Sequence, residues 1–540
     1  MLVGFSPARV TRFLQQMKTD TMFELAFHGE TMERDYWDVP LYATFRKGDT
    51  CTEVHGFYDG EGRYVIRFLP KEEGVYDYEV RGLFQKKGQI KVERNPDSKF
   101  IRAVGTHFED GAQRPFFPFG TTVYGLVHQE ESLIDKTFKT LGESPFNKIR
   151  FCVFPKHYDY NHNEPPYYPF LKKDPTQPIK NNHDASSPNL EFWHHFEKCL
   201  LRLLDLGIQA DVILFHPYDR WGLNELSQEN NFKYLDYALA RLSAFPHLWW
   251  SIANEYDLCL KRKSVEDFYR MEQFIASRDP FHHLLSCHNC FHPYDFSRPA
   301  ITHVSLQTKD LSSVHHLLSD FNKPVVIDEC CYEGDISAFW GSISPEEMTY
   351  RFARCLASGA YCTHGETYES DDEVLWWSKG GELKGESPLR IRFLKDLMKE
   401  IGSPLLPIPS FLVSFADMDK QERGKALESV PEEFRHYPKG IFLMGKDEAR
   451  RFFDSEYEYQ SKTEDGRVYF TFLDQRTCRE LDMDLPSNRV YRVELLDLYA
   501  MKRTTLSENV SGRTHLCFEP KIGQAILATE IKNHKGENHD

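Results

Sequence analysis

The sequence predicts a chain in which a (β/α)8 barrel, or TIM barrel, lies between two β-sandwiches. Eight short apolar runs alternate with helix-like segments in the middle of the chain, while both ends show strand-like runs without helical periodicity. A doubly wound open sheet is the competing topology, but no Gly-rich phosphate fingerprint follows the first apolar run. We expect domain boundaries near 1–95, 96–402 and 403–540.

The N-terminal segment reads as strands and turns. The dipeptide Asp59-Gly60 is a turn signal, and an alternating run from Tyr64 to Phe68 follows it. The stretch E-E-G-V-Y-D-Y-E-V gives a second alternation, so we expect a small β-sandwich here. Before it, residues 6–17 are expected to form one short helix.

The middle segment supplies the strands and helices of the barrel. Gly207 stands where a helix C-terminus favours glycine, and Ser344-Pro345 with Glu347 is an N-terminal capping pattern. The helix-like segments include 188–207, 230–245, 264–278 and 344–359. The candidate strands are 118–127, 147–155, 208–217, 247–256, 283–289, 301–307, 323–329 and 359–368.

The C-terminal segment begins with a Pro-rich link at 403–410. Beyond it, G-R-V-Y-F-T-F-L-D-Q, R-V-Y-R-V-E-L-L-D-L-Y and G-Q-A-I-L-A-T-E-I read as strands. We expect a second β-sandwich packed on the barrel.

Composition and charge restrict the partners. The net charge of −16 and the lack of a basic block disfavour nucleic acid. The first residues lack the apolar core of a signal peptide, and no apolar run is long enough to span a membrane. The spacing of the 12 cysteines indicates buried reduced thiols and not a disulfide framework. We therefore expect a cytoplasmic protein with no membrane partner, and a homo-oligomer stays open.

Two carboxylates occupy matching places at strand ends. Glu255 ends the fourth strand in S-I-A-N-E-Y-D, and Glu329 ends the seventh in P-V-V-I-D-E. Active residues of a barrel come from these ends, and a carboxylate at the tip of an apolar strand needs hydrogen-bond partners or a task. Period-two alternation lets only one of Asp328 and Glu329 face the barrel mouth, and Glu329 is nearer the strand end. Such a pair is the minimum set for glycoside hydrolysis.

The N-E after strand four and the E after strand seven resemble the signature of clan-A (β/α)8 retaining glycoside hydrolases. The resemblance implies that Glu255 is the acid/base and Glu329 the nucleophile. It also implies that Asn254 contacts the sugar 2-hydroxyl and that Arg150, on strand two, lies near the nucleophile. A guanidinium there would keep Glu329 ionised.

The resemblance extends over nearly the whole chain. G-F-Y-D-G, P-F-G-T-T-V-Y, F-N-K-I-R-F-C-V-F-P-K-H-Y-D-Y-N and T-H-G-E-T-Y are similar to a bacterial three-domain group of candidate glycoside hydrolases with an apiosidase-like barrel and flanking sandwiches. Two features depart from the clan. Strand six offers His303 where a tyrosine is common, and strand eight offers His364, Glu366 and Tyr368 where a tryptophan is common. We expect a polar sugar subsite.

Other side chains could line the same mouth. His216 and Asp219, after strand three, could bind substrate or form a loop-stabilising hydrogen bond. Trp221 and Trp340 could stack on sugar or pack in the loops. Glu366 could replace Glu329 as nucleophile or bind a sugar hydroxyl.

Metal ligands are also present in the sequence. Cys287, His288, Cys290 and His292 lie close together but lack the second half of a zinc site, so we expect no metal and no cofactor. The sequence thus predicts a retaining, exo-acting glycoside hydrolase whose substrates are small oligosaccharides or glycosides. Two alternatives stay open: a non-catalytic carbohydrate-binding protein on a barrel scaffold, and a metal-dependent TIM-barrel hydrolase.

Overall fold

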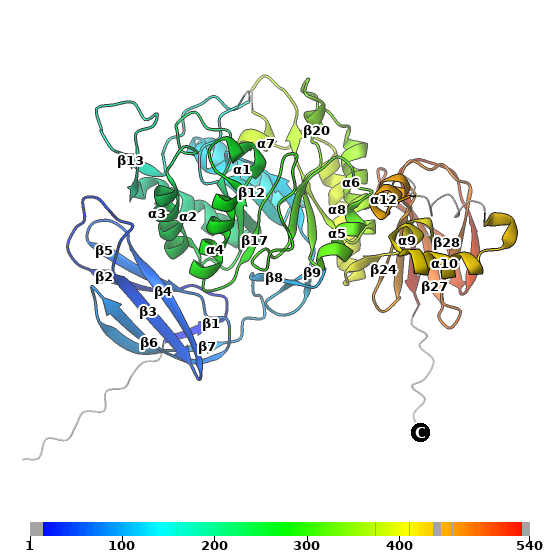
Figure 1. Cartoon of the computed structure of the whole chain (residues 1–540), viewed down its shortest axis with the longest axis horizontal. Helices are drawn as coiled ribbons and strands as arrows, with labels where there is room; N and C mark the ends of the chain where they lie inside the picture. The colour runs from blue at the N-terminus through cyan, green and yellow to red at the C-terminus, as the bar shows by residue number, and fades with distance from the viewer. Residues whose placement is uncertain are drawn as a thin grey trace, which may run out of the picture.

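The computed structural model describes residues 15–531, except 159, 373, 410, 436–443 and 455–456. A β-sandwich at the N-terminal end, a barrel and a β-rich C-terminal part follow one another along the long axis of the molecule (Figure 1). The predicted fold class is confirmed. In the part of the chain that is described, no helix is both long enough and apolar enough to cross a lipid bilayer.

Eight parallel strands form the barrel, and neighbouring strands pair in one continuous sheet. Each strand falls within one of the eight predicted runs, because buried parallel strands are apolar along their whole length. In chain order they are β11 (Phe119–Thr122), β12 (Lys148–Cys152), β15 (Gln209–Phe215), β16 (Leu248–Ala253), β17 (Leu284–Ser286), β18 (Val304–Gln307), β19 (Val325–Glu329) and β21 (Tyr361–His364).

Helices connect these strands, and the four predicted segments correspond to α2, α3, α4 and α6. Local capping sets their ends: the Ser344 side chain accepts from the Glu347 N–H at the start of α6, and Gly207 adopts a φ of 70° just beyond α2. The helices of this region are α1 (Glu131–Glu143), α2 (Leu190–Asp205), α3 (Gln228–Leu242), α4 (Val265–Arg278), α5 (Val314–Phe321), α6 (Pro345–Ala357), α7 (Trp376–Lys379) and α8 (Ser387–Ile401), with short 3₁₀ turns η1 (Leu126–His128), η2 (Tyr256–Lys261) and η3 (Phe339–Gly341).

A small antiparallel sheet closes the amino-terminal end of the barrel. Its strands are β8 (Ile101–Val104), β9 (His107–Asp110) and β10 (Pro115–Phe116). Phe108 of β9 is fully buried, with its ring centroid 4.9 Å from that of Trp249 and 5.4 Å from that of Tyr361. A ligand must therefore enter from the opposite end, where the strands finish.

The N-terminal sandwich contains seven strands, and its first strand corrects one prediction. Gln15–Lys18 forms β1, which pairs in parallel with β7, where we expected a helix over 6–17. Pairing with a free sheet edge overrides the local helical pattern there, and residues 6–14 lie outside the described residues. The other strands are β2 (Phe23–His28), β3 (Leu41–Lys47), β4 (Thr50–Tyr58), β5 (Arg63–Phe68), β6 (Gly74–Gly82) and β7 (Lys86–Glu93).

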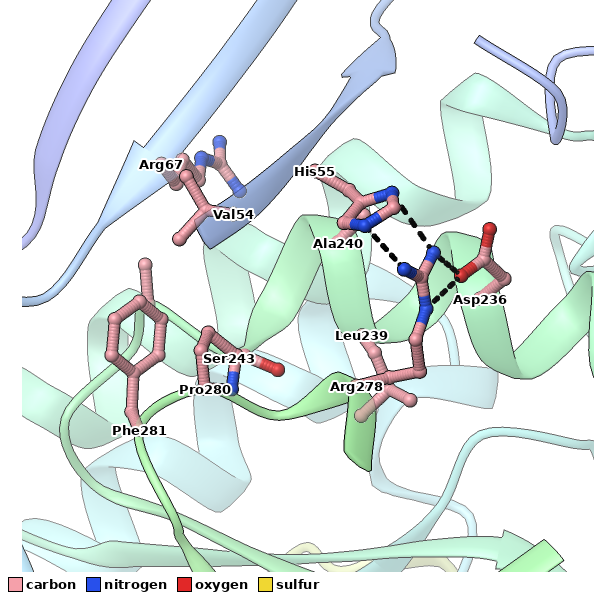
Figure 2. A pocket seen from close by; sticks show the side chains of 11 residues that line it. Val54, His55, Arg67, Asp236, Leu239, Ala240, Ser243, Arg278, Pro280 and Phe281 are labelled. Atoms are coloured by element: carbon pink, nitrogen blue, oxygen red, sulfur yellow. Dashed lines mark hydrogen bonds and ion pairs between the residues drawn. The ribbon is translucent and has the colours of Figure 1, made fainter. Parts of the chain in front are cut away.

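Buried charges dock this sandwich against helices α2, α3 and α4 of the barrel. Arg67 donates to both carboxylate oxygens of Glu197, at 2.5 and 3.1 Å, and Arg241 lies 2.8 Å from Asp59. Figure 2 shows a neighbouring contact, in which Arg278 lies between His55 and Asp236. Removing one member would leave a buried charge without its partner, so the two parts are tightly coupled.

The C-terminal part is a six-stranded sheet with a separate two-stranded pair, and it also holds helices that we did not predict. Helix α10 begins with a capping box in which Asp419 and Glu422 exchange hydrogen bonds, a signal that the sequence analysis overlooked. The helices are α9 (Phe411–Asp417), α10 (Lys420–Ser429) and α12 (Lys446–Asp454), with η4 (Glu432–Phe434). The strands are β23 (Leu405–Pro407), β24 (Tyr459–Thr463), β25 (Val468–Phe472), β26 (Glu480–Asp484), β27 (Tyr491–Asp497), β28 (Lys502–Val510), β29 (Arg513–Cys517) and β30 (Gln524–Glu530).

Candidate active site

Glu255 and Glu329 lie at the open end of the barrel and are connected through two side chains. They are 5% and 4% exposed. The Asn254 Nδ2 donates to Glu255 Oε2 at 3.0 Å, and the Tyr124 hydroxyl lies 3.1 Å from Asn254 Oδ1. The same hydroxyl donates to Glu329 Oε1. The Tyr124 hydroxyl has a single proton, so Asn254 Oδ1 accepts from Arg150 Nη2 at 3.3 Å when Tyr124 donates to Glu329. Contacts through Asn254, Tyr124 and Arg150 therefore link the two carboxylates in a single site.

The backbone at Glu255 is held in a conformation that residues with side chains rarely adopt. Its φ of 50° and ψ of 52° lie in the left-handed region, which costs on the order of 1–3 kcal/mol for a residue other than glycine. The Glu255 N–H points to His288 Nδ1 at 3.4 Å. This turn lets the consecutive side chains of Asn254 and Glu255 both enter the site, which regular strand alternation would prevent.

Strand β19 also departs from the regular alternation that would send consecutive side chains to opposite faces of the sheet. The pairing of β18 with β19 shifts register between Leu306 and Gln307, so that Gln307 pairs with Glu329. We predicted that only one of Asp328 and Glu329 could face the barrel mouth, because strand alternation would send the other to the opposite face of the sheet. In fact Asp328 contacts Ser305 and Thr363, from two other strands, while Glu329 reaches Tyr124. The bulge allows both carboxylates to point inward.

Two buried cations neutralise the carboxylates below the pair. Lys148 Nζ lies 2.6 Å from Asp211 and 2.7 Å from Asp328. Arg150 is fully buried, with Nη1 3.9 Å from Glu329 and Nη2 donating to Asn254 at 3.3 Å. Burial alone would raise the pKa of Asp328, but Lys148 and Arg150 hold it well below its usual range. Arg150 is thus placed to stabilise negative charge on Glu329.

Glu255 is in a different electrostatic state. Burial and then the charge of Glu329 raise the pKa of Glu255 to about 7, although Lys156, Tyr218 and Cys290 act in the opposite direction. The carboxyl of Glu255 can therefore hold a proton near neutral pH, as a general acid must.

Lys156 is a site residue that the sequence analysis missed. Its ammonium is buried 3.4 Å from the Tyr124 ring centroid and 4.3 Å from that of Tyr218. Burial lowers its pKa, while the charges of Glu255 and Glu329 partly restore it. Nothing in P-K-H-Y distinguishes a buried ammonium from a surface lysine.

Aromatic side chains near Glu329 take the place of two groups that the strand ends lack: a tyrosine after strand six and a tryptophan directly after strand eight. Tyr124, after strand one, and Tyr332, after strand seven, lie beside Glu329 where a tyrosine after strand six is common. Trp377, from the loop after strand eight, lies 5.3 Å from Tyr332 and 6.0 Å from Tyr124 between ring centroids. It is half-buried, so one part of its ring is open to a ligand. The sequence already places Trp377, with Trp221, Trp340 and Trp376, in the loops after strands three, seven and eight, and one or two of these four were expected to stack on sugar.

His303 lies at the wrong end of the barrel for the role that we expected. It precedes β18, and its ring packs 5.3 Å from that of Trp249 and 5.8 Å from that of Phe108, in the layer that closes the barrel. The strand begins one residue later, at Val304, so His303 cannot reach the open mouth.

The residues after strand three shape a loop. Asp219 accepts from the backbone N–H groups of Trp221, Gly222 and Asn224, and His216 Nε2 faces the Phe154 carbonyl at 3.0 Å. These contacts favour the loop-stabilising role for Asp219. Its partners are backbone amides, whereas we expected His216 to be the partner. Trp221 is 2% exposed, which leaves no free face for stacking.

His364, Glu366 and Tyr368 gather around a second carboxylate, Glu333. The Tyr368 hydroxyl donates to Glu333 Oε1 at 3.1 Å, and His364 Nε2 lies 4.0 Å from Glu333 Oε2. Glu366 accepts from the backbone N–H groups of 384 and 385, at 2.6 and 2.9 Å. No contact among the described residues joins this group to Glu255 or Glu329, so the geometry does not favour Glu366 as the nucleophile. Trp340 is half-buried in η3, and its carbonyl accepts from the Tyr332 N–H.

The sequence motif around Cys287 contacts Glu255. His288 faces the Glu255 N–H, and the Cys290 thiol interacts with the Glu255 carboxyl. In the described part of the chain, the groups of side chains that could hold a metal ion lie elsewhere.

Two cavities are lined by residues of the loops that follow the barrel strands. A cavity of about 670 Å³ is lined by Tyr218, which interacts with Glu255, and by polar residues that include Asp219, Asn224 and Asp257. A second cavity of about 550 Å³ is lined by residues that include Tyr160, His162 and Lys379, from the loops after strands two and eight.

Comparisons with known proteins agree with the barrel fold. The family model "Apiosidase-like, catalytic domain" matches residues 103–400, and that of a domain of unknown function, DUF5060, matches residues 18–82. A candidate glycoside hydrolase from Bacteroides vulgatus ATCC 8482 is 29% identical, with a TM-score of 0.81 over 96% of this chain and 100% of that chain. A family 5 glycoside hydrolase from the same organism is 14% identical, with a TM-score of 0.55 over 80% of this chain and 93% of that chain.

No protein with a curated description is significantly similar to the chain. The barrel match covers more than half of the sequence, and the solved relatives support a glycosidase. With the carboxylate pair at the ends of strands four and seven, the chain belongs to the apiosidase-like catalytic-domain family.

Proposed function

We propose that the protein hydrolyses glycosidic bonds with retention of configuration, using Glu329 as nucleophile and Glu255 as acid/base. One observation carries the proposal: two buried carboxylates with different environments are linked through the side chains of Asn254, Tyr124 and Arg150. Arg150 faces Glu329, whereas the raised pKa of Glu255 keeps its proton near neutral pH. Such a difference between two carboxyls supports Glu255 as the acid and Glu329 as the nucleophile.

The reaction has two steps. In the first, a Glu329 oxygen attacks the anomeric carbon as the bond to the leaving oxygen breaks, and Glu255 gives its proton to that oxygen. In the second, Glu255 takes a proton from water, whose oxygen attacks the anomeric carbon and releases Glu329. Asn254 is placed to bind a hydroxyl of the same sugar ring.

The neighbouring charges suit both steps. Arg150 and the Tyr124 hydroxyl stabilise Glu329 as an anion before attack and after release. When Glu329 forms the ester, its negative charge disappears and the repulsion that raises the pKa of Glu255 is removed. Lys156 then stabilises the ionised Glu255 that must accept a proton from water.

We further propose small glycosides or short oligosaccharides as substrates and exo-acting cleavage. The cavity of about 670 Å³ beside Tyr218 is on the acid/base side, where a leaving group departs. Its polar lining suits a hydroxylated leaving group. Half-buried Trp377 offers a flat apolar surface for the C–H face of a sugar.

A panel of nitrophenyl glycosides, including an apioside, and of short plant oligosaccharides tests the proposal. Glu329→Ala should be inactive on every substrate that the unchanged protein cleaves. Glu255→Ala should keep turnover of nitrophenyl glycosides, whose leaving group needs no proton, and lose that of oligosaccharides. Equal losses on both classes would reject Glu255 as the acid, and normal turnover by Glu329→Ala would reject the nucleophile.

The stereochemistry provides a separate test. Proton NMR of the first product should show the anomer of the substrate, and the opposite anomer would exclude double displacement. Sugar binding without turnover on the whole panel would favour the non-catalytic alternative.

A further inference from the structure

A second carboxylate pair lies above strands seven and eight, apart from the proposed catalytic pair. Glu333 of β20 (Glu333–Gly334) pairs with Glu366 of β22 (Glu366–Thr367), and His364 ends β21 two residues earlier. One oxygen of each carboxylate and one ring nitrogen of His364 all lie within 4.8 Å of one another. His364 Nε2 is 4.0 Å from Glu333 Oε2.

The His364 Nε2 atom has no hydrogen-bond partner among the described residues, and the side chain is fully buried. Its other nitrogen, Nδ1, lies 3.2 Å from Thr121 Oγ1, which fixes the orientation of the ring. A buried imidazole nitrogen without a partner is costly. Here that nitrogen points at two carboxylates.

The two carboxylates are buried without a nearby cationic side chain. Glu333 and Glu366 are 0% and 1% exposed. In the described ranges, no lysine or arginine forms an ion pair with either of them. The nearest candidate, Lys384, directs its ammonium to Ser370, Asp372 and the Val374 carbonyl. Two carboxylates buried this close together repel each other whenever both are ionised, and a bound cation would remove that repulsion.

Backbone N–H groups hold both carboxylates in fixed positions. Glu333 accepts from the N–H groups of Glu386 and Ser387, at 2.8 and 3.3 Å, at the start of α8. A side chain at Gly385 would come within 2.5 Å of Glu333, so a glycine is required for this approach. The donor atoms are therefore pre-positioned before any ligand arrives.

We propose that Glu333, His364 and Glu366 bind one divalent transition-metal ion, Zn²⁺ or Mn²⁺. One imidazole and two carboxylates are ligands that these ions accept, whereas Mg²⁺ and Ca²⁺ prefer oxygen alone. In tetrahedral coordination, metal–ligand bonds of about 2.0–2.2 Å place two donors about 3.3–3.6 Å apart. His364 Nε2 and Glu333 Oε2 are 4.0 Å apart, so a rotation of either side chain that closes about half an ångström would bring them to this spacing.

The ion would supply the missing positive charge and tie together the loop after strand seven, the end of strand eight and the start of α8. The role is structural, because none of the three ligands contacts Glu255 or Glu329 among the described residues. It departs from our expectation of no metal, which considered only the motif around Cys287.

Metal content and coordination of the full chain test the proposal. The protein is stripped with EDTA, incubated with excess Zn²⁺, Mn²⁺ or Co²⁺, desalted, and measured by inductively coupled plasma mass spectrometry. Co²⁺ also gives visible absorption bands from a nitrogen and oxygen ligand set. The variants are His364→Ala and Glu366→Gln. The matched control is His515→Ala, because Glu480, His515 and Cys517 form an exposed group that could also take up metal.

We expect one ion per chain in the unchanged protein and in His515→Ala, and at least a tenfold loss of binding in both other variants. Metal should also raise the Tm of the stripped protein by several degrees, a readout that does not depend on whether the variants fold. The proposal is overturned if the unchanged protein retains no ion and shows no Tm shift. It is equally overturned if binding is lost only in His515→Ala.

Discussion

Two pairs of buried glutamates lie at the open end of the same barrel, and they are stabilised in different ways. Around Glu255 and Glu329, the partners are side chains: Arg150, Lys156 and the tyrosine hydroxyls. Around Glu333 and Glu366, the partners are mainly backbone N–H groups, with the hydroxyls of Tyr368 and Ser387 on Glu333 and the His364 Nε2 atom nearby, and no cationic side chain among the described residues forms an ion pair with them.

This difference in partners separates Glu255 and Glu329, which we propose to react, from Glu333 and Glu366, which we propose to be structural. Mobile protons and cationic side chains allow the charge on Glu255 and Glu329 to change during a reaction. Backbone N–H groups hold Glu333 and Glu366 in fixed positions and do not exchange protons with them during a reaction. Burial and strand-end position alone, which both pairs share, do not identify a catalytic residue.

The largest expected effect is the loss of turnover in Glu329→Gln. The amide keeps the shape of the side chain but cannot attack the anomeric carbon, so kcat/KM should fall by about 10⁴-fold or more. Glu366→Gln, the corresponding change in the other pair, should reduce kcat/KM far less. Initial rates on a nitrophenyl glycoside give both values, and the reverse order would make Glu366 the nucleophile.

The second effect is on stability. Glu333→Ala removes the acceptor for the N–H groups of Glu386 and Ser387 at the buried start of α8. We expect the free energy of unfolding to fall by about 3 kcal/mol. Denaturant unfolding measures it. Asn254→Ala is the control in the reactive pair, and an equal loss of stability there would remove the contrast between the two pairs.

The third effect concerns Lys156. Lys156→Met keeps the apolar stem between Tyr124 and Tyr218 but removes the positive charge. We expect kcat to fall by about 10–100-fold, because the ionised Glu255 loses a stabilising charge. KM should change less. A change in KM alone would assign Lys156 to substrate binding.

The smallest effect is a shift of the pH profile. Glu255 must be protonated to act as the acid, and its pKa is about 7, so kcat/KM should decline as the pH rises above about 7. Lys156 lowers this pKa, so Lys156→Met should move the alkaline limb to higher pH, by about one unit. A limb that stays in place, or moves to lower pH, would contradict the assignment of Glu255.

The periodic features of the sequence predicted the fold well. All eight barrel strands and the helices at 188–207 and 344–359 follow from apolar runs and capping signals that act locally. The C-terminal helices were not predicted, because the alternating strand-like runs dominate that part of the sequence. The capping box at Asp419 is the local signal that marks the start of α10.

The site was predictable only in part. Strand-end logic points to Glu255 and Glu329, whose positions depend on local sequence. Tyr124, Lys156 and Trp377 come from three different loops, and their convergence depends on tertiary packing that no spacing in the sequence encodes. The inward turn of both Asp328 and Glu329 depends on a bulge that simple alternation cannot represent.

The docking of the N-terminal sandwich has a consequence for how the enzyme can be divided. Arg241 and Glu197 belong to barrel helices, yet Asp59 and Arg67 of the sandwich complete their charge balance. A barrel expressed alone would expose this charged surface together with the apolar residues around it (Figure 2). Gene fragments that begin after the sandwich should therefore yield aggregated protein, and recombination within this family is expected to exchange both parts as one unit.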